Sequence, residues 1–431
     1  MSVGLARLRE EPELLRRAAQ DKGEDAAIVD EAVAVDAERR RLLSEVEGLR
    51  GERKEVSARV GAALKADQTG GQVEQLRAES VALGSRIDER EARLRELEAR
   101  LDDLLLRIPN PADPDVPVGG EEASVILRSW GEALAHEADG WARRPHWEVA
   151  EGLGIFDLAG GAKVTGSGFP VYRGAGAALQ RALIDLMLDI HTREHGMTEI
   201  WPPALVNEAS ARGTGQIPDK EDQMYVVTRD DLYLVPTAEV PVTNLHRDEI
   251  LEGARLPIRY VAYSPCFRRE AGAAGRQTRG ILRVHQFDKV EMVCFERPQD
   301  SPAALEWLTE RAEVVLQRLG LAYRVKLMST REMGFVQARK YDLEVWAPGV
   351  QEWLEVSSVS NFRDYQARRM NIRYRPDQGA KAEIVHTLNG SGLALARTVA
   401  ALLETFQRRE GGISVPAALH ARLGPELLPP G

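Results

Sequence analysis

The chain has few cysteines, no long apolar run and no apolar segment near its N-terminus. Only Cys266 and Cys294 occur among its 431 residues, so the sequence offers neither a disulfide framework nor a cysteine pair with metal-ligand spacing. No run approaches the ~18 apolar residues that a membrane span requires. The first residues are strongly charged, unlike those of a secretory signal. We therefore expect a cytoplasmic protein that does not associate with a membrane.

Positive charge is also in deficit. The chain has 57 Lys and Arg residues against 67 Asp and Glu residues, which gives a net charge of -10. Taken alone, this balance argues against sequence-independent binding to nucleic acid. Most of the basic residues are arginine, however, and arginine is suited to bidentate contacts with phosphate. A specific nucleic-acid partner is therefore not excluded.

An Ala-, Glu-, Arg- and Leu-rich segment, from about residue 28 to 108, has apolar residues at heptad spacing, which predicts two long helices with a shared seam. The paired glycines of residues 65–71 favour a reversal, so we expect an antiparallel coiled-coil hairpin over about 30–108, within a helical domain of residues 1–110. Nearby glutamates balance the arginines, so charge alone does not separate a binding arm from a dimerisation or spacer element. The seam positions are Leu42, Val46, Leu49, Arg53, Val56, Val60 and Ala63, then Val73, Leu76, Ser80, Leu83, Ile87, Arg90, Leu94, Leu97, Leu101 and Leu104.

A proline-rich segment, IPNPADPDVPVGG (108–120), is unsuited to a helix or a central strand and marks a domain boundary. The second predicted domain, residues 111–431, has more strand-like than helix-like segments. Few of its strands are separated by the helices that parallel crossovers need, so we expect an α+β fold with a mostly antiparallel sheet flanked by helices. The clearest helices are predicted over 176–195, 305–319 and 392–407, with a glycine turn at Asn389-Gly390 before the last of them.

The chain has no phosphate-binding loop of the G-x-x-x-x-G-K-[ST] type. Residues 191–195 match H-x-x-E-H, a pattern of some zinc proteases, which would place His191 and His195 on one face of a helix. The motif stands at the end of a predicted helix, where the helix dipole favours histidine, and no third ligand is indicated. We therefore interpret this pair as structural.

The segment CFRREAGAAGRQTRGILRVHQFDKVE (266–291) predicts a hairpin, because two strand-like runs flank a Gly- and Ala-rich loop that contains Arg276 and Arg279. A cation, carboxylates and an aromatic ring on one sheet surface could together hold a phosphate, an ammonium group and a purine. An ordinary ladder of cross-strand ion pairs would explain the hairpin equally well. Period-2 alternation places Arg268 with Glu270 on one face, and Phe287 with Lys289 and Glu291 on one face.

Two further segments favour a ligand-binding surface over an ordinary ladder of ion pairs. In EVSSVSNFRDYQARR (355–369) a carboxylate stands beside hydroxyls, a set of hard oxygens that suits Mg²⁺ on a triphosphate. In HTLNGSGLALARTVAALLE (386–404) we expect Asn389 and Ser391 in the glycine turn and Arg397 in the first turns of the following helix. Arg397 would offer phosphate another cation.

With these motifs in order, the sequence resembles the class II aminoacyl-tRNA synthetases, and in particular the bacterial-type seryl-tRNA synthetase family, over essentially its full length. Motif 1 matches the helix that leads through Gly196 to EIWPP, motif 2 matches residues 266–292, and motif 3 matches residues 392–404. The runs typical of the seryl branch are GTGQIP (213–218), TAE (237–239), YDLEVW (341–346) and HTLNGSG (386–392).

The resemblance implies that the N-terminal arm binds tRNA and that residues 111–431 form the catalytic domain. It implies ATP and L-serine as substrates, Mg²⁺ as the metal, tRNA(Ser) as the acceptor and a homodimer joined through motif 1. It leaves open whether tRNA(Sec) is also charged. Arg268 would act on the α-phosphate and the serine carboxylate, and Arg397 on the γ-phosphate.

The resemblance also assigns the remaining residues of the site. Glu355 and Ser358 would hold the metal. The serine-binding residues would be Thr237, Ala238, Glu239, Arg268, Glu291, Thr387, Asn389 and Ser391. The ATP-binding residues would be Arg268, Arg269, Glu270, Val284, Phe287, Glu355, Val356, Ser357, Ser358 and Arg397.

Some positions depart from the family pattern. Arg269 stands where a small residue is more usual, Val359 replaces a frequent cysteine, and Phe362 is atypical. Two alternatives also remain. A paralogue that loads a small amino acid onto a carrier protein would lack the long arm, and a non-catalytic tRNA-binding pseudo-enzyme would lose arginines or glutamates of the motifs. This chain keeps both features.

Overall fold

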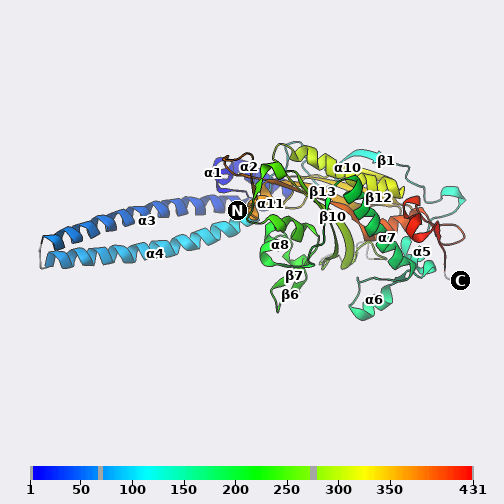
Figure 1. Ribbon diagram of the computed structural model, residues 1–431, viewed down its shortest axis with the longest axis horizontal. Coiled ribbons are helices and arrows are strands. Elements are labelled where there is room, and N and C mark those ends of the chain that lie inside the picture. The colour runs from blue at the N-terminus through cyan, green and yellow to red at the C-terminus, as the bar shows by residue number, and fades with distance from the viewer. Residues whose placement is uncertain (1–2, 67–70, 272–278, 430–431) are drawn as a thin grey trace. The chain divides into compact units, whose positions relative to one another are not determined.

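The computed structural model describes residues 3–66, 71–271 and 279–429. The chain forms two compact units, Met1–Pro109 and Asn110–Gly431. The first is helical and the second contains a large sheet (Figure 1). Within the described residues, no helix is both long and apolar enough to cross a membrane.

The N-terminal unit is dominated by a helical hairpin, as the heptad spacing predicts (Figure 1). At 1.5 Å per residue, the 39 residues of α3 extend over about 58 Å. The helices are α1 (Leu5–Glu10), α2 (Pro12–Lys22), α3 (Ala27–Lys65) and α4 (Gly71–Arg107). The buried seam residues are Leu42, Val46, Leu49 and Val56 of α3 and Val73, Leu76, Leu83, Ile87, Leu97, Leu101 and Leu104 of α4.

Charged residues of the hairpin lie mostly at its surface. Arg53, a predicted seam position, is exposed, and its guanidinium lies over Gly84, which has no side chain to displace it. Asp36 is an exception, because it is buried and accepts two hydrogen bonds from Arg9 of α1, which lower the pKa of Asp36. Ion pairs between α3 and α4 join Arg50 to Glu91, Arg93 to Glu38 and Arg100 to Glu31.

The C-terminal unit is built on an eight-stranded sheet in the order β1-β11-β12-β13-β16-β10-β9-β4. Neighbouring strands are antiparallel except for β4 and β9, which are parallel, so the predicted α+β class with a mostly antiparallel sheet is confirmed. The strands are β1 (Val125–Trp130), β4 (Thr198–Ile200), β9 (Ile258–Phe267), β10 (Gln286–Glu296), β11 (Tyr323–Leu327), β12 (Arg339–Ala347), β13 (Glu352–Arg363) and β16 (His386–Ala394).

Alternation along β10 directs side chains to two faces of the sheet. Met292 and Cys294 belong to the main core, which the long helices cover, whereas Val293 and Phe295 belong to a second core on the other face. The helices of this unit are α5 (His146–Leu153), α6 (Leu158–Val164), α7 (Ala175–Asp189), α8 (Glu208–Thr214), α9 (Glu239–Thr243), α10 (Ser301–Leu319), α11 (Tyr365–Arg369), α12 (Leu395–Thr405) and α13 (His420–Leu423).

Among the described residues, four small sheets accompany the large one. Their strands are β2 (Phe156–Asp157) with β3 (Val171–Tyr172), β5 (Leu205–Asn207) with β6 (Val226–Val227) and β7 (Leu232–Leu234), β8 (Ile250–Glu252) with β14 (Arg373–Arg375) and β15 (Glu383–Ile384), and β17 (Ile413–Ser414) with β18 (Glu426–Leu427).

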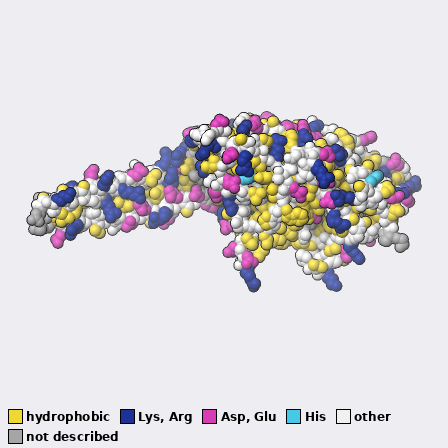
Figure 2. Space-filling model, in the orientation of Figure 1, with side chains coloured by type: hydrophobic (Ala, Val, Ile, Leu, Met, Phe, Trp, Pro, Cys, Tyr) yellow, Lys and Arg dark blue, Asp and Glu magenta, His cyan; other side chains and the backbone are white. Residues whose placement is uncertain are grey.

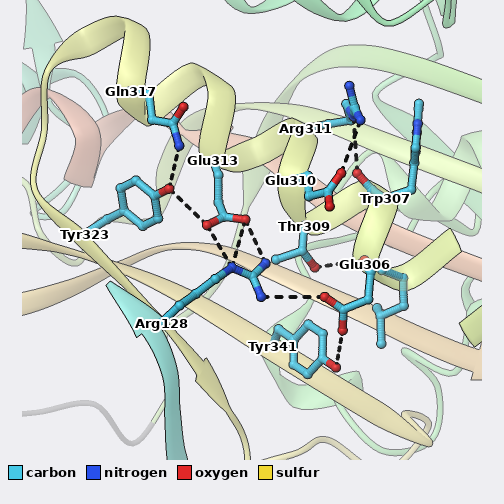
Figure 3. A network of polar contacts seen from close by, with 11 residues as sticks. Arg128, Glu306, Trp307, Thr309, Glu310, Arg311, Glu313, Gln317, Tyr323 and Tyr341 are labelled. Atoms are coloured by element: carbon cyan, nitrogen blue, oxygen red, sulfur yellow. Dashed lines mark hydrogen bonds and ion pairs between the residues drawn. The ribbon is translucent and has the colours of Figure 1, made fainter. Parts of the chain in front are cut away.

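A polar network fastens the edge strand β1 to α10 (Figure 3). Arg128 donates to the nearly buried carboxylate of Glu313, with Nη2 2.7 Å from Oε2, and also forms an ion pair with Glu306. The Tyr323 hydroxyl donates to Glu313 at 2.9 Å and accepts a hydrogen bond from Gln317. The carboxylate of Glu313 is therefore satisfied from β1 and β11 together.

Two local predictions are wrong. Asn389 and Gly390 do not form a turn; they lie inside β16, and the last helix begins only at Leu395. The glycines serve close packing, because a Cβ at Gly390 would lie 2.9 Å from the Val359 side chain and one at Gly392 would lie 2.5 Å from His191 Nε2. The motif 1 helix α7 also ends early, at Asp189, and continues as a π-helical turn over Ile190–Glu194.

Candidate active site

One cavity of about 520 Å³ collects nearly all of the predicted site residues. It is lined from α9, β10, β13, β16, α12 and the segments before β10 and after α8. Ala238, Arg269 and Thr387 are the predicted residues that do not line it. The predicted residues that do are Thr237, Glu239, Arg268, Glu270, Val284, Phe287, Glu291, Glu355, Val356, Ser357, Ser358, Asn389, Ser391 and Arg397.

A buried charged cluster forms one part of the cavity wall. Lys289 and Glu291, two residues apart on β10, make an ion pair, and Lys289 Nζ also donates to Thr237 Oγ1 at 2.8 Å. The Thr237 hydroxyl in turn donates to Glu291 Oε2 at 3.2 Å. Strand alternation identifies Lys289 as a neighbour of Glu291, but the sequence assigns it no role. The structure makes it the cation that balances a buried carboxylate.

Glu239 stands beside this cluster at the start of α9. Its side chain is buried, and burial, followed by the nearby negative charge of Glu291, raises the pKa of Glu239. Gln366 of α11 donates from Nε2 to Glu239 Oε1 at 2.6 Å. Thr387 does not line the cavity, and its hydroxyl donates to Gln366 Oε1 at 2.8 Å. Gln366 is not among the site residues predicted from the sequence.

The motif 2 residues lie at the end of β9 and in the segment that returns to β10. Arg268 lines the cavity with its guanidinium 5.1 Å from the centre of the Phe287 ring. Glu270 lies beyond the strand with a φ of 50°, and its carboxylate accepts from Arg283 at 2.6 Å, so strand alternation is not what brings Arg268 and Glu270 to one cavity. Arg269 is exposed and donates to the Asp222 carbonyl.

Arg397 of α12 is held by two carbonyl groups. Its Nη1 donates to the Glu355 oxygen at 2.8 Å and its Nε to the Leu282 oxygen at 3.2 Å. Its Nη1 is also 3.8 Å from the Glu355 carboxylate. Burial acts to raise the pKa of Glu355, but the positive charges of four nearby cations together outweigh it and the pKa is lowered. These cations are, in order of effect, Lys340, Arg397, Arg268 and Lys289. Glu355 therefore stays ionised inside a cationic region.

Hard oxygen atoms lie near Glu355. Ser358 is on the same strand, and Asp342 lies opposite Ser358 on β12, with a buried Oδ1 that has no hydrogen-bond partner among the described residues. No group of three His, Cys, Asp or Glu residues is placed to bind a metal in the ranges that the structure describes. One carboxylate and one hydroxyl suit Mg²⁺ when phosphate oxygens complete its shell. The donor set thus fits a metal that arrives with a nucleotide.

The buried pair His146 and Glu404 holds the segment that leads from the motif 2 loop to β10. His146 Nδ1 and Glu404 Oε1 are 2.8 Å apart, and His146 Nε2 accepts from the Ile281 amide at 3.3 Å. Arg279 lies over the Trp147 ring at 4.8 Å. Arg276, the other predicted loop arginine, lies outside the described residues. Sequence reasoning missed His146, because only the folded chain brings it to this loop.

The two histidines of the H-x-x-E-H run lie close together where the motif 1 helix ends. His191 Nδ1 and His195 Nδ1 lie 3.0 Å apart. Burial, followed by the neighbouring His195, lowers the pKa of His191 to about 3. Within the described chain no third metal-ligating side chain completes the pair.

The chain is similar to known proteins over nearly its whole length. Residues 4–112 match the seryl-tRNA synthetase N-terminal domain, and residues 225–406 match the tRNA synthetase class II core domain (G, H, P, S and T). The serine–tRNA ligase of Gemmatimonas aurantiaca is 48% identical over 98% of each chain. That of Geobacillus kaustophilus is 50% identical over 97% of each chain.

The similarity extends to the fold of a solved structure. The crystal structure of seryl-tRNA synthetase from Pyrococcus horikoshii, complexed with ATP, has a TM-score of 0.93 and 38% identity to this chain. The similarity covers 99% of this chain and 100% of that one. The chain therefore belongs to the seryl-tRNA synthetase family.

Proposed function

We propose that this chain activates L-serine with ATP to form seryl-adenylate and then transfers the seryl group to the 3′ end of tRNA(Ser). The observation that carries the proposal is the convergence, on one cavity, of two arginines with a pair of buried carboxylates. Arg268 and Arg397 suit a polyphosphate, and Glu239 and Glu291 suit a hydroxyl and an ammonium group. The family relationship supports the same assignment.

The first step needs no protein nucleophile. A serine carboxylate oxygen attacks the α-phosphorus of ATP, a new oxygen–phosphorus bond forms, and the bond to the bridging oxygen breaks to release pyrophosphate. No proton has to move. Arg268 near the α-phosphate and Arg397 near the γ-phosphate would orient the nucleotide and offset the charge that develops. Phe287 would stack on the purine, which orients ATP further.

Glu355 and Ser358 would hold Mg²⁺ together with phosphate oxygens. Bound there, the ion would neutralise phosphate charge and help to orient the leaving group. The chain's own part is to keep Glu355 ionised, which the surrounding cations Lys340 and Arg397 favour. Serine would be recognised by its ammonium group at Glu291 and by its hydroxyl at Glu239.

In the second step a 3′-terminal hydroxyl of tRNA attacks the seryl carbonyl carbon, the bond from that carbon to the phosphate oxygen breaks, and AMP leaves. The proton of the hydroxyl is released with the departing phosphate. We assign the tRNA grip to the α3–α4 hairpin of the helical domain (1–110) and the chemistry to the catalytic domain (111–431). Charging of tRNA(Sec) is a further outcome to be measured with the same enzyme. Because its product serves protein synthesis, we place its action in the cytoplasm.

We also propose a homodimer through motif 1. Trp201, directly after β4, is 80% exposed, although tryptophan is a large apolar side chain. It lines a shallow apolar hollow with Pro202, Pro203 and Tyr263. β4 is an edge strand of the large sheet, so this surface is open to a second copy.

ATP–pyrophosphate exchange over a panel of amino acids tests the proposal. We expect exchange with serine and little with alanine, threonine or glycine. Charging is then measured with tRNA(Ser), with tRNA(Sec) and with an acyl carrier protein. Serine exchange without charging of either tRNA would favour the carrier-loading alternative, and no exchange with any amino acid would favour the pseudo-enzyme.

A further inference from the structure

We propose that Gln366 is a specificity-determining positioning residue, which holds the Glu239 carboxylate in the orientation that reads the hydroxyl of the amino acid. The inference rests on the proposed function, because it concerns how serine is told apart from smaller amino acids. Gln366 lies on α11 and does not line the cavity, so it acts on the substrate through Glu239.

Both polar atoms of the Gln366 side-chain amide form hydrogen bonds. Nε2 donates to Glu239 Oε1 at 2.6 Å and to the Thr214 carbonyl at 3.1 Å. Oε1 accepts from the Thr387 hydroxyl at 2.8 Å. Both amide hydrogens thus meet acceptors, and the amide oxygen meets a donor.

This pattern permits one orientation of the amide. A rotation by 180° would place the amide oxygen against a carboxylate and a carbonyl, two acceptors, and would turn the NH₂ group toward Thr387. Gln366 and Thr387 are each about 1% exposed, so water cannot repair a wrong arrangement cheaply. The amide therefore fixes the position of Glu239 Oε1.

The same helix also holds the segment that follows α8. Arg369, one turn after Gln366, donates from Nη1 to the Arg212 carbonyl at 3.0 Å, and Gln366 holds the Thr214 carbonyl. The next residues, Gly215 and Gln216, line the cavity. α11 thereby ties together α8, α9 and β16 behind one part of the wall.

The position of Glu239 matters because its carboxylate is buried. With Oε1 engaged by Gln366, the second oxygen, Oε2, is left for a ligand hydroxyl, and the described residues supply no hydrogen bond to it. Glu291, Lys289 and Lys220 are the charged groups that act on Glu239. Serine would satisfy Oε2, whereas alanine would leave it unpaired, and an unpaired buried acceptor is what gives strong discrimination.

Three variants test the proposal in the full-length protein. Gln366→Met removes the amide at similar volume. Gln366→Glu keeps the shape but sets a second carboxyl against Glu239. Gln407→Met is the matched control, because Gln407 is also a buried amide, which donates to the carbonyls of Arg144 and Glu404 and accepts from the Arg144 amide, and does not line the cavity.

The readouts are pyrophosphate-exchange kinetics with serine and alanine, the KM for ATP, and Tm. For Gln366→Met we expect a serine KM at least about tenfold higher and a serine-over-alanine preference reduced by at least about tenfold, with the ATP KM within about twofold of the parent. For Gln407→Met we expect a lower Tm but the parent preference. For Gln366→Glu the preference for serine should fall strongly at pH 8 and partly recover at pH 6. The reason is that two adjoining carboxyls bind a shared proton as the pH falls, and that proton can replace the amide donor.

Several results would overturn the proposal. One is a folded Gln366→Met protein whose preference lies within about twofold of the parent, and another is a control that loses preference to the same extent. If neither Gln366 variant folds, Thr387→Val decides, since it removes only the hydroxyl that sets the amide; an unchanged preference would then count against us. Failure of the proposed function looks different, because the parent protein itself would show no serine-dependent exchange.

Discussion

The two units of this chain handle charge in opposite ways. In the hairpin, ion pairs such as Arg50 with Glu91 lie at the surface, with side chains 63% and 28% exposed. In the C-terminal unit, Lys289 and Glu291 are 8% and 2% exposed and both hydrogen-bond to the same threonine, Thr237. Figure 2 shows basic and acidic side chains interspersed along the hairpin surface.

The difference has an energetic meaning. Exposed pairs typically contribute about 0–1 kcal/mol each, so the hairpin is held mainly by its apolar seam. Its exposed ion pairs could be exchanged for contacts with a partner at little cost in stability. A buried pair gives little net stability but costs about 3–5 kcal/mol when one member is removed. The buried charges of the C-terminal unit therefore add little net stability, but removing one partner of such a pair should lower stability as well as disturb the cavity.

The largest effect expected in the cavity comes from Arg268→Ala. Serine-dependent pyrophosphate exchange should fall by about 10²-fold or more, because the guanidinium acts on charge that develops in the transition state. Steady-state exchange kinetics measure this. Arg229→Ala, on the exposed β6–β7 connection, is the control and should leave exchange unchanged. Exchange by Arg268→Ala within a few-fold of the parent would remove Arg268 from the mechanism.

Glu239→Ala should have a more selective effect. The serine KM should rise by about tenfold or more and the preference over alanine should erode, while the KM for ATP stays close to that of the parent. Competition between serine and alanine in the exchange assay measures the preference. An unchanged preference would mean that Glu239 does not read the side chain.

Mild acid should weaken the catalytic unit through His191. Its pKa is lowered to about 3 when folded, so the unfolded chain binds a proton first as the pH falls below about 6.5. Its contribution is complete above about pH 6.5 and declines by up to about 1.4 kcal/mol per pH unit as the pH falls toward 3.

Buried carboxyls such as Glu239 titrate in the opposite sense, so the test is a difference between two proteins. The unfolding free energies of the parent and of His191→Gln are compared by denaturant titration at pH 7.5, 6 and 5. Relative to the variant, the parent should lose stability as the pH falls. Parallel pH profiles would contradict the assignment. All eight histidines lie in residues 110–431, so the hairpin should not share this loss.

The smallest effect is expected in the hairpin. Arg50→Gln should lower the unfolding free energy by no more than about 0.5 kcal/mol, because its ion pair with Glu91 is exposed. If Arg50 meets phosphate, the same change should weaken tRNA binding and reduce the salt dependence of the binding constant. Filter-binding titrations at several salt concentrations measure this. A loss of 2 kcal/mol or more in stability would erase the contrast between the units.

The sequence predicts the hairpin well because its signal is local. Heptad spacing at Leu42, Leu49 and Val56 is visible in the chain and becomes the buried seam. Arg53 breaks that pattern; it is tolerated because it is exposed and its guanidinium lies over the facing Gly84. Periodicity thus indicates which residues meet, but not how an exception is accommodated.

In the C-terminal unit, some site contacts follow from local sequence patterns and others do not. Alternation along β10 correctly brings Phe287, Lys289 and Glu291 to one cavity. The glycines around Asn389 suggest a turn, yet they lie in a strand, at positions where a facing side chain leaves no room for a Cβ. Gln366 reaches Glu239 from 127 residues away, and no local pattern encodes that contact.

The central claim is that the cavity activates serine without the hairpin, whereas charging of tRNA requires it. Residues 46–89 can be replaced by a short glycine-rich linker that keeps α1, α2 and the contact of Arg9 with Asp36. Serine-dependent pyrophosphate exchange and aminoacylation of tRNA(Ser) are then measured on the same preparation. We expect exchange within about twofold of the parent and aminoacylation reduced by about 10²-fold or more, because most phosphate contacts are lost. A shortened protein that charges tRNA as well as the parent would contradict the account.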